Sequence, residues 1–197
     1  MDTLLVELSH AHDRYAAVWP AEPDTLHLFR DFLVSSSNVF ERSHAIGHFT
    51  GSAWLVSADE SRVLLTHHRK LDRWLQLGGH ADGDADLARV ALREAEEESG
   101  LTGLWVEREI FDLDRHRIPA RGGEPEHWHY DVRFVVRTND SEDFVVSDES
   151  HALAWREIAS LTDDGTADPS LRRMAGKWLA ATSGISSPSG RGWPKAG

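Results

Sequence analysis

Three glutamates stand close together in the segment LREAEEESGL, residues 92–101. Glu94, Glu97 and Glu98 occupy positions i, i+3 and i+4, which share one side of a helix, whereas Glu96 points elsewhere. Like charges at this spacing destabilise a helix by roughly a few tenths of a kcal/mol per pair. A divalent cation would offset that repulsion, and carboxylate oxygens are ligands that suit Mg²⁺ or Mn²⁺. The spacing therefore indicates a metal site.

The residues around the glutamates could complete such a site. The Gly78-Gly79 pair would let the backbone pass close to the carboxylates, so that a peptide carbonyl can join the ligands. Arg93 stands four residues before Glu97 and can brace that carboxylate by a charge-assisted hydrogen bond. The alternative interpretation is a solvated acidic helix end, which is what most acidic runs are.

A helix over about residues 85–99 would present these carboxylates. Asp84 suits the N-cap position, and Gly100 can take the left-handed conformation that ends a helix. One narrow stripe of mostly small residues would let the helix sit close to a sheet. The stripe consists of Ala88, Ala91, Leu92, Ala95 and Ser99.

The segment resembles the Nudix box, G-x5-E-x7-R-E-U-x-E-E-x-G-U, where U is aliphatic. The matching residues are Gly79, Arg93, Glu94, Ala95 at the inner U, Glu97, Glu98, Gly100 and Leu101. One position departs, because Ala85 stands where the family has its first Glu, between Asp84 and Asp86, either of which could substitute. The run GGHADGD resembles a bacterial subgroup with this variant loop, and the resemblance extends loosely over residues 45–165.

This resemblance implies a metal-dependent hydrolase that cleaves a diphosphate linkage in a nucleoside diphosphate linked to another group. The implied catalytic residues are Arg93, Glu94, Glu97 and Glu98, and the implied ligands of Mg²⁺ or Mn²⁺ are Gly79 and the three glutamates. The main alternative is a module of the same fold that senses a nucleotide or ADP-ribose without turnover. Isomerisation of isopentenyl diphosphate, on a related fold, relies on a cysteine that this chain lacks.

The stretch HWHYD, residues 127–131, is the second unusual feature. On a strand, Trp128 and Tyr130 would face the core, while His127, His129 and Asp131 would share the other face. That face could line the substrate cleft, could be solvated, or could hold a transition metal with His116 as a further ligand.

Basic residues gather at residues 67–74, just before the glycine pair. Arg69, Lys70 and Arg73 could grip substrate phosphates, although an ordinary solvated turn is an equal alternative. Glu149, in the later segment SDES, could supply an accessory ligand or base.

Composition limits the classes of partner. The 197 residues include 21 Lys and Arg against 33 Asp and Glu, a net charge of −12, which disfavours nucleic-acid binding. There is no Cys, so disulfides, thiolate nucleophiles and Cys-based zinc sites are excluded. We expect a soluble cytoplasmic protein, because no signal peptide and no apolar run of about 20 residues is present.

The order of the expected elements predicts an α/β protein in which helices cover both faces of a mixed sheet, the α/β/α sandwich of Nudix proteins. Residues 1–42 read as a helical extension that could form a homodimer surface or a lid, and 43–182 as the Nudix domain. Short strands are expected at 51–57, 62–68, 73–77, 104–113 and 127–138, and helices at 155–161 and after Pro169. The Ser-, Gly- and Pro-rich tail, 183–197, is expected to be disordered.

Overall fold

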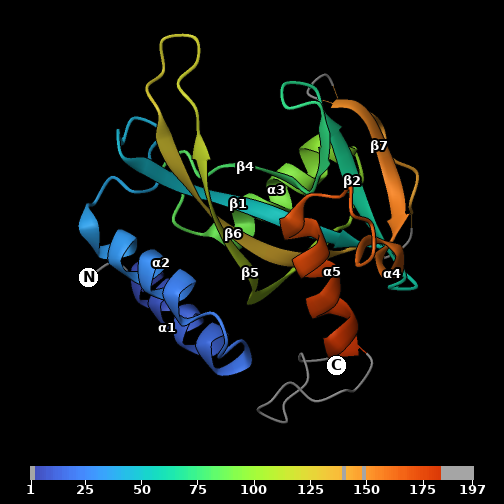
Figure 1. The fold of residues 1–197 in the computed structure, drawn as a ribbon, viewed down its shortest axis with the longest axis horizontal. Helices are drawn as coiled ribbons and strands as arrows, with labels where there is room; N and C mark the ends of the chain where they lie inside the picture. The colour runs from blue at the N-terminus through green and yellow to red at the C-terminus, as the bar shows by residue number, and fades with distance from the viewer. Residues whose placement is uncertain (1–2, 139–140, 148–149, 183–197) are drawn as a thin grey trace.

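The computed structural model describes residues 3–138, 141–147 and 150–182. Two helices come first and precede every strand, and a single long helix interrupts the series of strands (Figure 1). The elements are α1 (Thr3–Val18), α2 (Pro23–Ser35), β1 (Gly47–Val56), β2 (Arg62–His68), β3 (Arg73–Leu75), β4 (Leu77–His80), α3 (Leu87–Ser99), β5 (Trp105–Ile118), β6 (His127–Arg137), β7 (Ser150–Glu157), α4 (Ile158–Leu161) and α5 (Pro169–Thr182).

The strands of the described residues form one mixed, seven-stranded sheet with β1 at its centre. The main path runs β3-β2-β1-β6-β5, while β4 pairs with β1 and β7 pairs with β2. Strands β1 and β6 are parallel over ten residue pairs, from Gly47 with Trp128 to Val56 with Arg137. Strands β5 and β6 form a long antiparallel hairpin, and residues 119–126 connect them.

Helices cover both faces of this sheet. Side chains alternate along β1, so that Trp54 packs in one apolar cluster with α5, whereas Leu55 packs in another cluster with Ala95 of α3. Figure 1 shows α5 in front of the sheet and α3 behind it. The predicted α/β/α sandwich is therefore confirmed.

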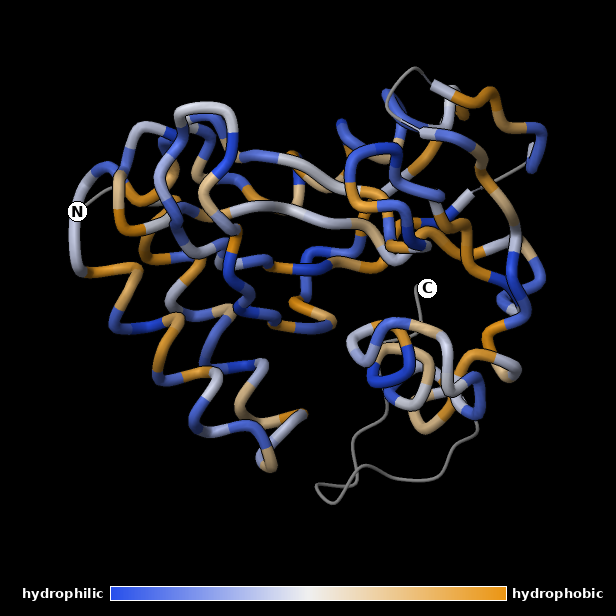
Figure 2. The backbone as a smooth tube through the Cα atoms, turned by 45° about the horizontal axis from the view of Figure 1, so that its top comes forward, coloured by the Kyte–Doolittle hydropathy of each residue, from blue (hydrophilic) through white to orange (hydrophobic). Residues whose placement is uncertain are grey.

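The N-terminal helices α1 and α2 pack against the sheet. Each helix alternates apolar and polar positions, visible as orange and blue segments in Figure 2. Phe29 and Phe32 of α2 are buried beside Phe49 of β1 and Tyr130 of β6, and the rings of Phe32 and Tyr130 stack at 3.7 Å. The helices of residues 1–42 thus extend the core of the sheet.

A buried ionic network also ties α1 to the sheet and to α5. Asp112 of β5 is completely buried and accepts hydrogen bonds from Arg133, Arg173 and Lys177. Lys177 of α5 also donates to the hydroxyl of Tyr15 on α1 at 2.7 Å. Burial alone would raise the pKa of Asp112, but the hydrogen bond from Arg173 and the neighbouring cations lower it.

Several expected element boundaries are wrong: β1 begins at Gly47 rather than at residue 51, and β5 continues to Ile118 rather than to residue 113. Helix α3 begins at Leu87 with Asp86 as its N-cap, two residues later than predicted, because the Asp84 carboxylate instead accepts the backbone N–H of Asp86. The helix expected at 155–161 begins three residues later than predicted: β7 continues to Glu157 because it pairs with β2, and only Ile158–Leu161 is helical. The start of α5 at Pro169 is as predicted, with Asp168 accepting the N–H of Ser170.

The remaining predictions at the ends of the chain have different outcomes. The tail expected at 183–197 lies outside the described residues. In the part of the chain that the structure describes, no helix is long and apolar enough to span a membrane.

Candidate active site

Helix α3 lies directly against β1 and β4, and two facing glycines permit this approach. Gly51 of β1 and Gly79 of β4 are paired across the antiparallel strands. A Cβ atom on Gly51 would lie 2.7 Å from the carbonyl oxygen of Leu87, in the first turn of α3. No larger residue fits at position 51 unless the helix moves away.

Gly79 leaves room for the carboxylate of Glu94. A Cβ atom on Gly79 would lie 2.5 Å from Cδ of Glu94, so this carboxylate rests on the backbone of β4. Arg93 fixes the contact, because its Nη2 donates to Oε1 of Glu94 at 2.9 Å and to the carbonyl of His80 at 3.1 Å. The expected brace between Arg93 and Glu97 is replaced by this pair, since the β4 carbonyl draws the guanidinium toward the sheet.

Glu98 reaches the same glycine strand one turn further along α3. Its Oε1 accepts the backbone N–H of Gly78 at 2.8 Å, and its side chain is buried. Glu97, in contrast, is exposed, as is Glu96. Among the described residues, the one set of three potential ligand atoms within 4.8 Å of one another comes from histidines, so the carboxylates of Glu94, Glu97 and Glu98 do not close on one point.

These residues fit a hard divalent cation. The donors are carboxylate oxygens and the backbone of β4, which Mg²⁺ and Mn²⁺ prefer to sulfur or imidazole. The space that a Cβ would fill at Gly79 keeps the backbone accessible beside Glu94. The site therefore has the donors for the predicted metal.

The two aspartates beside Ala85 have local partners. Asp84 accepts hydrogen bonds from Nε and Nη2 of Arg89. Asp86 caps α3 and pairs with Arg108 at 3.0 Å. Ala85 itself packs against the apolar cluster beneath the N-terminal helices. These contacts hold the first turn of α3 in place.

The sequence also matches a family model. The model of the NUDIX domain matches residues 48–176, more than half of the chain. The chain belongs to the Nudix family. The matched range spans the sheet and the Nudix helix α3, ends within α5, and leaves out α1 and α2.

Solved structures share the Nudix fold with this chain. An Ap4A hydrolase of C. elegans, in a binary complex, is 18% identical with a TM-score of 0.55, and the match covers 69% of this chain and 98% of that one. A NUDIX-family hydrolase from Clostridium perfringens is 24% identical with a TM-score of 0.54, covering 68% and 97%. A MutT protein from Methanosarcina mazei Go1 is 16% identical with a TM-score of 0.54, covering 68% and 94%. A search of curated proteins found no match.

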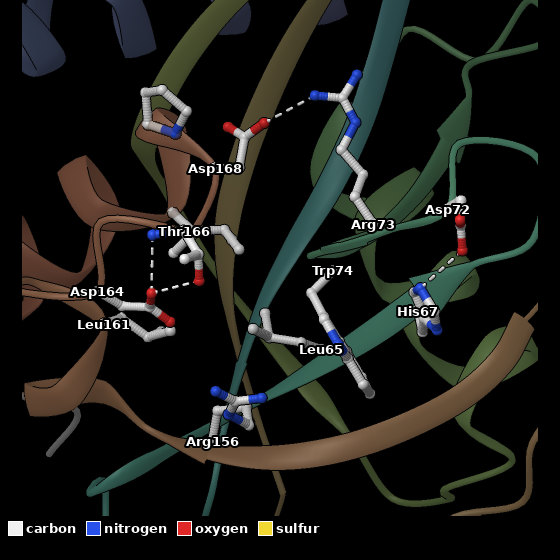
Figure 3. A pocket seen from close by; sticks show the side chains of 13 residues that line it. Leu65, His67, Asp72, Arg73, Trp74, Arg156, Leu161, Asp164, Thr166 and Asp168 are labelled. Carbon is white, nitrogen blue, oxygen red and sulfur yellow. Dashed lines mark hydrogen bonds and ion pairs between the residues drawn. The ribbon is translucent and has the colours of Figure 1, made fainter.

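The basic residues predicted as a phosphate clamp lie at the β2–β3 turn. Arg69 donates to the carbonyl of Ser150 at 3.0 Å, and Lys70 is exposed. Arg73 pairs with Asp168 at 3.2 Å and lines a hollow of about 550 Å³ between β2, β3 and the α4–α5 region (Figure 3). All three residues are exposed, and Arg69 and Arg73 each have a partner elsewhere in the chain.

The polar face of β6 is more buried than a solvated strand face would be. Tyr130 is buried in the core as predicted, but Asp131 and Arg133 on the opposite face are buried as well. Asp131 accepts hydrogen bonds from Thr50, Ser52, Gln76 and Arg133. The carboxylate shares its sheet face with the histidines, but its hydrogen bonds are made to β1, Gln76 and its own strand.

Two further histidines, which the sequence did not group with His127 and His129, join them in the structure. His48 of β1 and His80 of β4 lie beside His129, with ring centroids 4.8 Å and 5.1 Å away. Burial lowers the pKa of His48 and His80 to about 4, and that of His129 to about 2. The parallel pairing of β1 with β6 brings His48 next to His129. No local sequence pattern predicts this pairing. Glu149, the predicted accessory group, lies outside the described residues.

Proposed function

We propose that this Nudix protein is a metal-dependent hydrolase that cleaves a diphosphate linkage in a nucleoside diphosphate linked to another group. The observation that carries the proposal is the placement of Glu94 and Glu98 on the two glycines of β4, with Arg93 fastening helix to strand. A solvated acidic helix end would not need those contacts.

Glu94, Glu97, Glu98 and the carbonyl of Gly79 would hold Mg²⁺ or Mn²⁺ against the diphosphate. When bound, such an ion stabilises charge on the phosphoryl oxygens and makes water acidic enough to lose a proton near neutral pH. Arg93 keeps the Glu94 carboxylate in place by a charge-assisted hydrogen bond. The Gly78 N–H does the same for Glu98.

The reaction is hydrolysis of a phosphoanhydride. A water oxygen attacks one phosphorus, the bond from that phosphorus to the bridging oxygen breaks, and the second phosphate leaves with the bridging oxygen. The carboxylate of Glu94 or Glu98 takes the proton of the attacking water, since both are held beside the glycine strand. The main contribution of the protein is to position the reactants and to stabilise charge.

The substrate is proposed to be a small molecule. The net charge of −12 opposes binding of polyanions through bulk electrostatics, so an anionic substrate depends on local cations. Lys70, exposed at the β2–β3 turn, is a candidate for such a contact. The similarity to an Ap4A hydrolase is consistent with a nucleotide-containing substrate.

A substrate panel tests this proposal. The protein is incubated with Mg²⁺ or Mn²⁺ and nucleoside triphosphates, ADP-ribose, dinucleoside polyphosphates or NADH, and phosphate is measured after phosphatase treatment. Metal-dependent turnover of at least one compound is expected. Binding of ADP-ribose or a nucleotide with no turnover of any compound would instead establish a sensing module.

A further inference from the structure

Five histidines gather on the sheet face that points away from α3. They are His48 of β1, His80 of β4, His116 of β5, and His127 and His129 of β6, here called the histidine cluster. Each ring has another ring of the cluster with its centroid between 4.8 and 5.4 Å away. Nothing in the proposed hydrolysis uses these side chains.

Strand register explains why distant histidines meet. His48 of β1 is paired with His129 of β6, and His129 is paired with His116 of β5, so the three form a row across three adjacent strands. Residues paired in this way point to the same face of a sheet. His80 of β4 is paired with Thr50 of β1, which stands two residues after His48. Four strands thus deliver imidazoles to one place.

The centre of the cluster contains buried nitrogen atoms that lack partners. His48 is only 2% exposed, and neither of its ring nitrogens has a hydrogen-bond partner among the described residues. Nε2 of His129 is likewise buried without a partner in that part of the chain. Burying such a group without a partner is unfavourable, because its interaction with water is lost and nothing replaces it. A ligand that accepts electron pairs from several nitrogens would remove these costs together.

We propose that His48, His80 and His129 bind one transition-metal ion, such as Zn²⁺, through their imidazole nitrogens. Each of these residues offers a ligand atom, and the three atoms all lie within 4.8 Å of one another. Tetrahedral zinc at the usual 2.0–2.1 Å needs nitrogen atoms about 3.4 Å apart, so modest ring rotations close the site. Three protein ligands leave a fourth position for a solvent or substrate oxygen.

The neighbouring side chains fit this assignment. Nδ1 of His116 lies 3.1 Å from the Asp114 carboxylate, and Nδ1 of His127 lies 2.9 Å from the carbonyl of Pro125, so both rings are held in place around the site. The buried acid on this face, Asp131, is occupied by its own hydrogen bonds. The donors are therefore nitrogen atoms, which favour Zn²⁺, Co²⁺ or Ni²⁺ over Mg²⁺.

The histidine cluster is distinct from the carboxylate site on α3. Strand β4 separates the two, since Gly79 faces Glu94 on the α3 side, whereas His80 takes the opposite side of the strand. The two sites also differ in ligand chemistry, so that one hard and one borderline ion could bind together. The zinc proposal thus does not depend on the proposed hydrolysis.

Cobalt is the probe that distinguishes the sites. Chelator-treated full-length protein is titrated with Co²⁺ in excess Mg²⁺, and the visible absorption of Co²⁺ is recorded together with calorimetric binding. One equivalent of Co²⁺ with the intense bands of a low-coordinate nitrogen site is expected. Subsequent Zn²⁺ should displace it and abolish the bands. Absence of any Co²⁺ binding under these conditions would overturn the proposal.

Variants assign the ligands. His80→Ala and His129→Gln should each weaken Co²⁺ binding by about tenfold or more, because each removes a direct ligand. His27→Ala, at an exposed histidine of α2, is the matched control and should bind as wild type does. Circular dichroism establishes that each variant is folded, and because His80 and His129 lie on different strands, either folded variant alone gives a reading. Loss of the bands in Glu97→Gln, with retention in the histidine variants, would place the ion at the glutamates and contradict the proposal.

Discussion

Gly79 and Glu94 are in contact across the interface between β4 and α3, at a distance that leaves no room for a side chain on residue 79. A Cβ atom there would lie 2.5 Å from Cδ of Glu94. The same carboxylate is bonded to Arg93, which in turn holds the carbonyl of His80. One glycine therefore determines where a proposed metal ligand sits.

Gly79→Ala should reduce metal-dependent turnover by about tenfold or more while the protein stays folded. The added methyl group collides with the end of a flexible side chain, so Glu94 moves and the fold survives. Steady-state assays and thermal unfolding check the two halves of this statement. Gly165→Ala, where no atom lies within 4 Å of the new Cβ, is the control. Equal activity of both variants would show that Glu94 needs no fixed position.

Asp112→Asn should destabilise the protein by about 3 kcal/mol, because it leaves the buried cations Arg133 and Lys177, and the partly exposed Arg173, without their shared anion. Urea unfolding gives the change in free energy. Glu109→Gln is the matched control, since its exposed pair with Arg14 also joins β5 to α1 and should contribute at most about 1 kcal/mol. If the two substitutions cost the same, the buried network would not be what holds α1 and α5 to the sheet.

His12 should make the stability of the N-terminal helices depend on pH. It is fully buried in α1 with neither ring nitrogen bonded within the described residues, and burial lowers its pKa from 6.5 to about 4. The unfolded chain therefore binds more protons between these pH values. Stability is fully present above pH 6.5 and falls as the pH drops toward 4, by at most about 1.4 kcal/mol per pH unit.

Substitution isolates this contribution from the other groups that titrate in the same range. The free energy of unfolding of His12→Leu should fall less steeply than that of wild type between pH 6.5 and 4, whereas His10→Leu, exposed on the same helix, should follow wild type. Urea titrations at several pH values supply the slopes. Parallel curves for wild type and His12→Leu would refute the assignment.

Local patterns in the sequence predicted the features that depend only on residues close together in the chain. The small-residue stripe of the Nudix helix is buried at Ala88, Ala91, Ala95 and Ser99, because helical periodicity alone sets that face. The start of the helix was harder to predict, since Asp84 and Asp86 are both good caps and the choice rests on one hydrogen bond. Alternation along residues 127–136 likewise identified the core face of β6.

Features that depend on strand pairing could not be predicted in this way. Residues 155–157 have a helical composition, yet they are strand because β2 offers them a partner about ninety residues earlier in the chain. The histidine cluster arises similarly, from the parallel register of His48 with His129. The burial of Asp131 and Arg133 follows from hydrogen bonds across β1 and β5 that involve residues far away in sequence.

Turnover of a diphosphate substrate by Glu97→Gln, compared with Glu96→Gln, tests the central claim most directly. Both residues are exposed on α3 and adjacent in sequence, but only Glu97 belongs to the proposed metal ligands. With Mg²⁺ or Mn²⁺ and the compound that wild type hydrolyses, Glu97→Gln should lose about 10²-fold or more in kcat/KM, and Glu96→Gln should stay near wild type. Wild-type activity of Glu97→Gln would contradict the assignment of the metal to the Nudix helix.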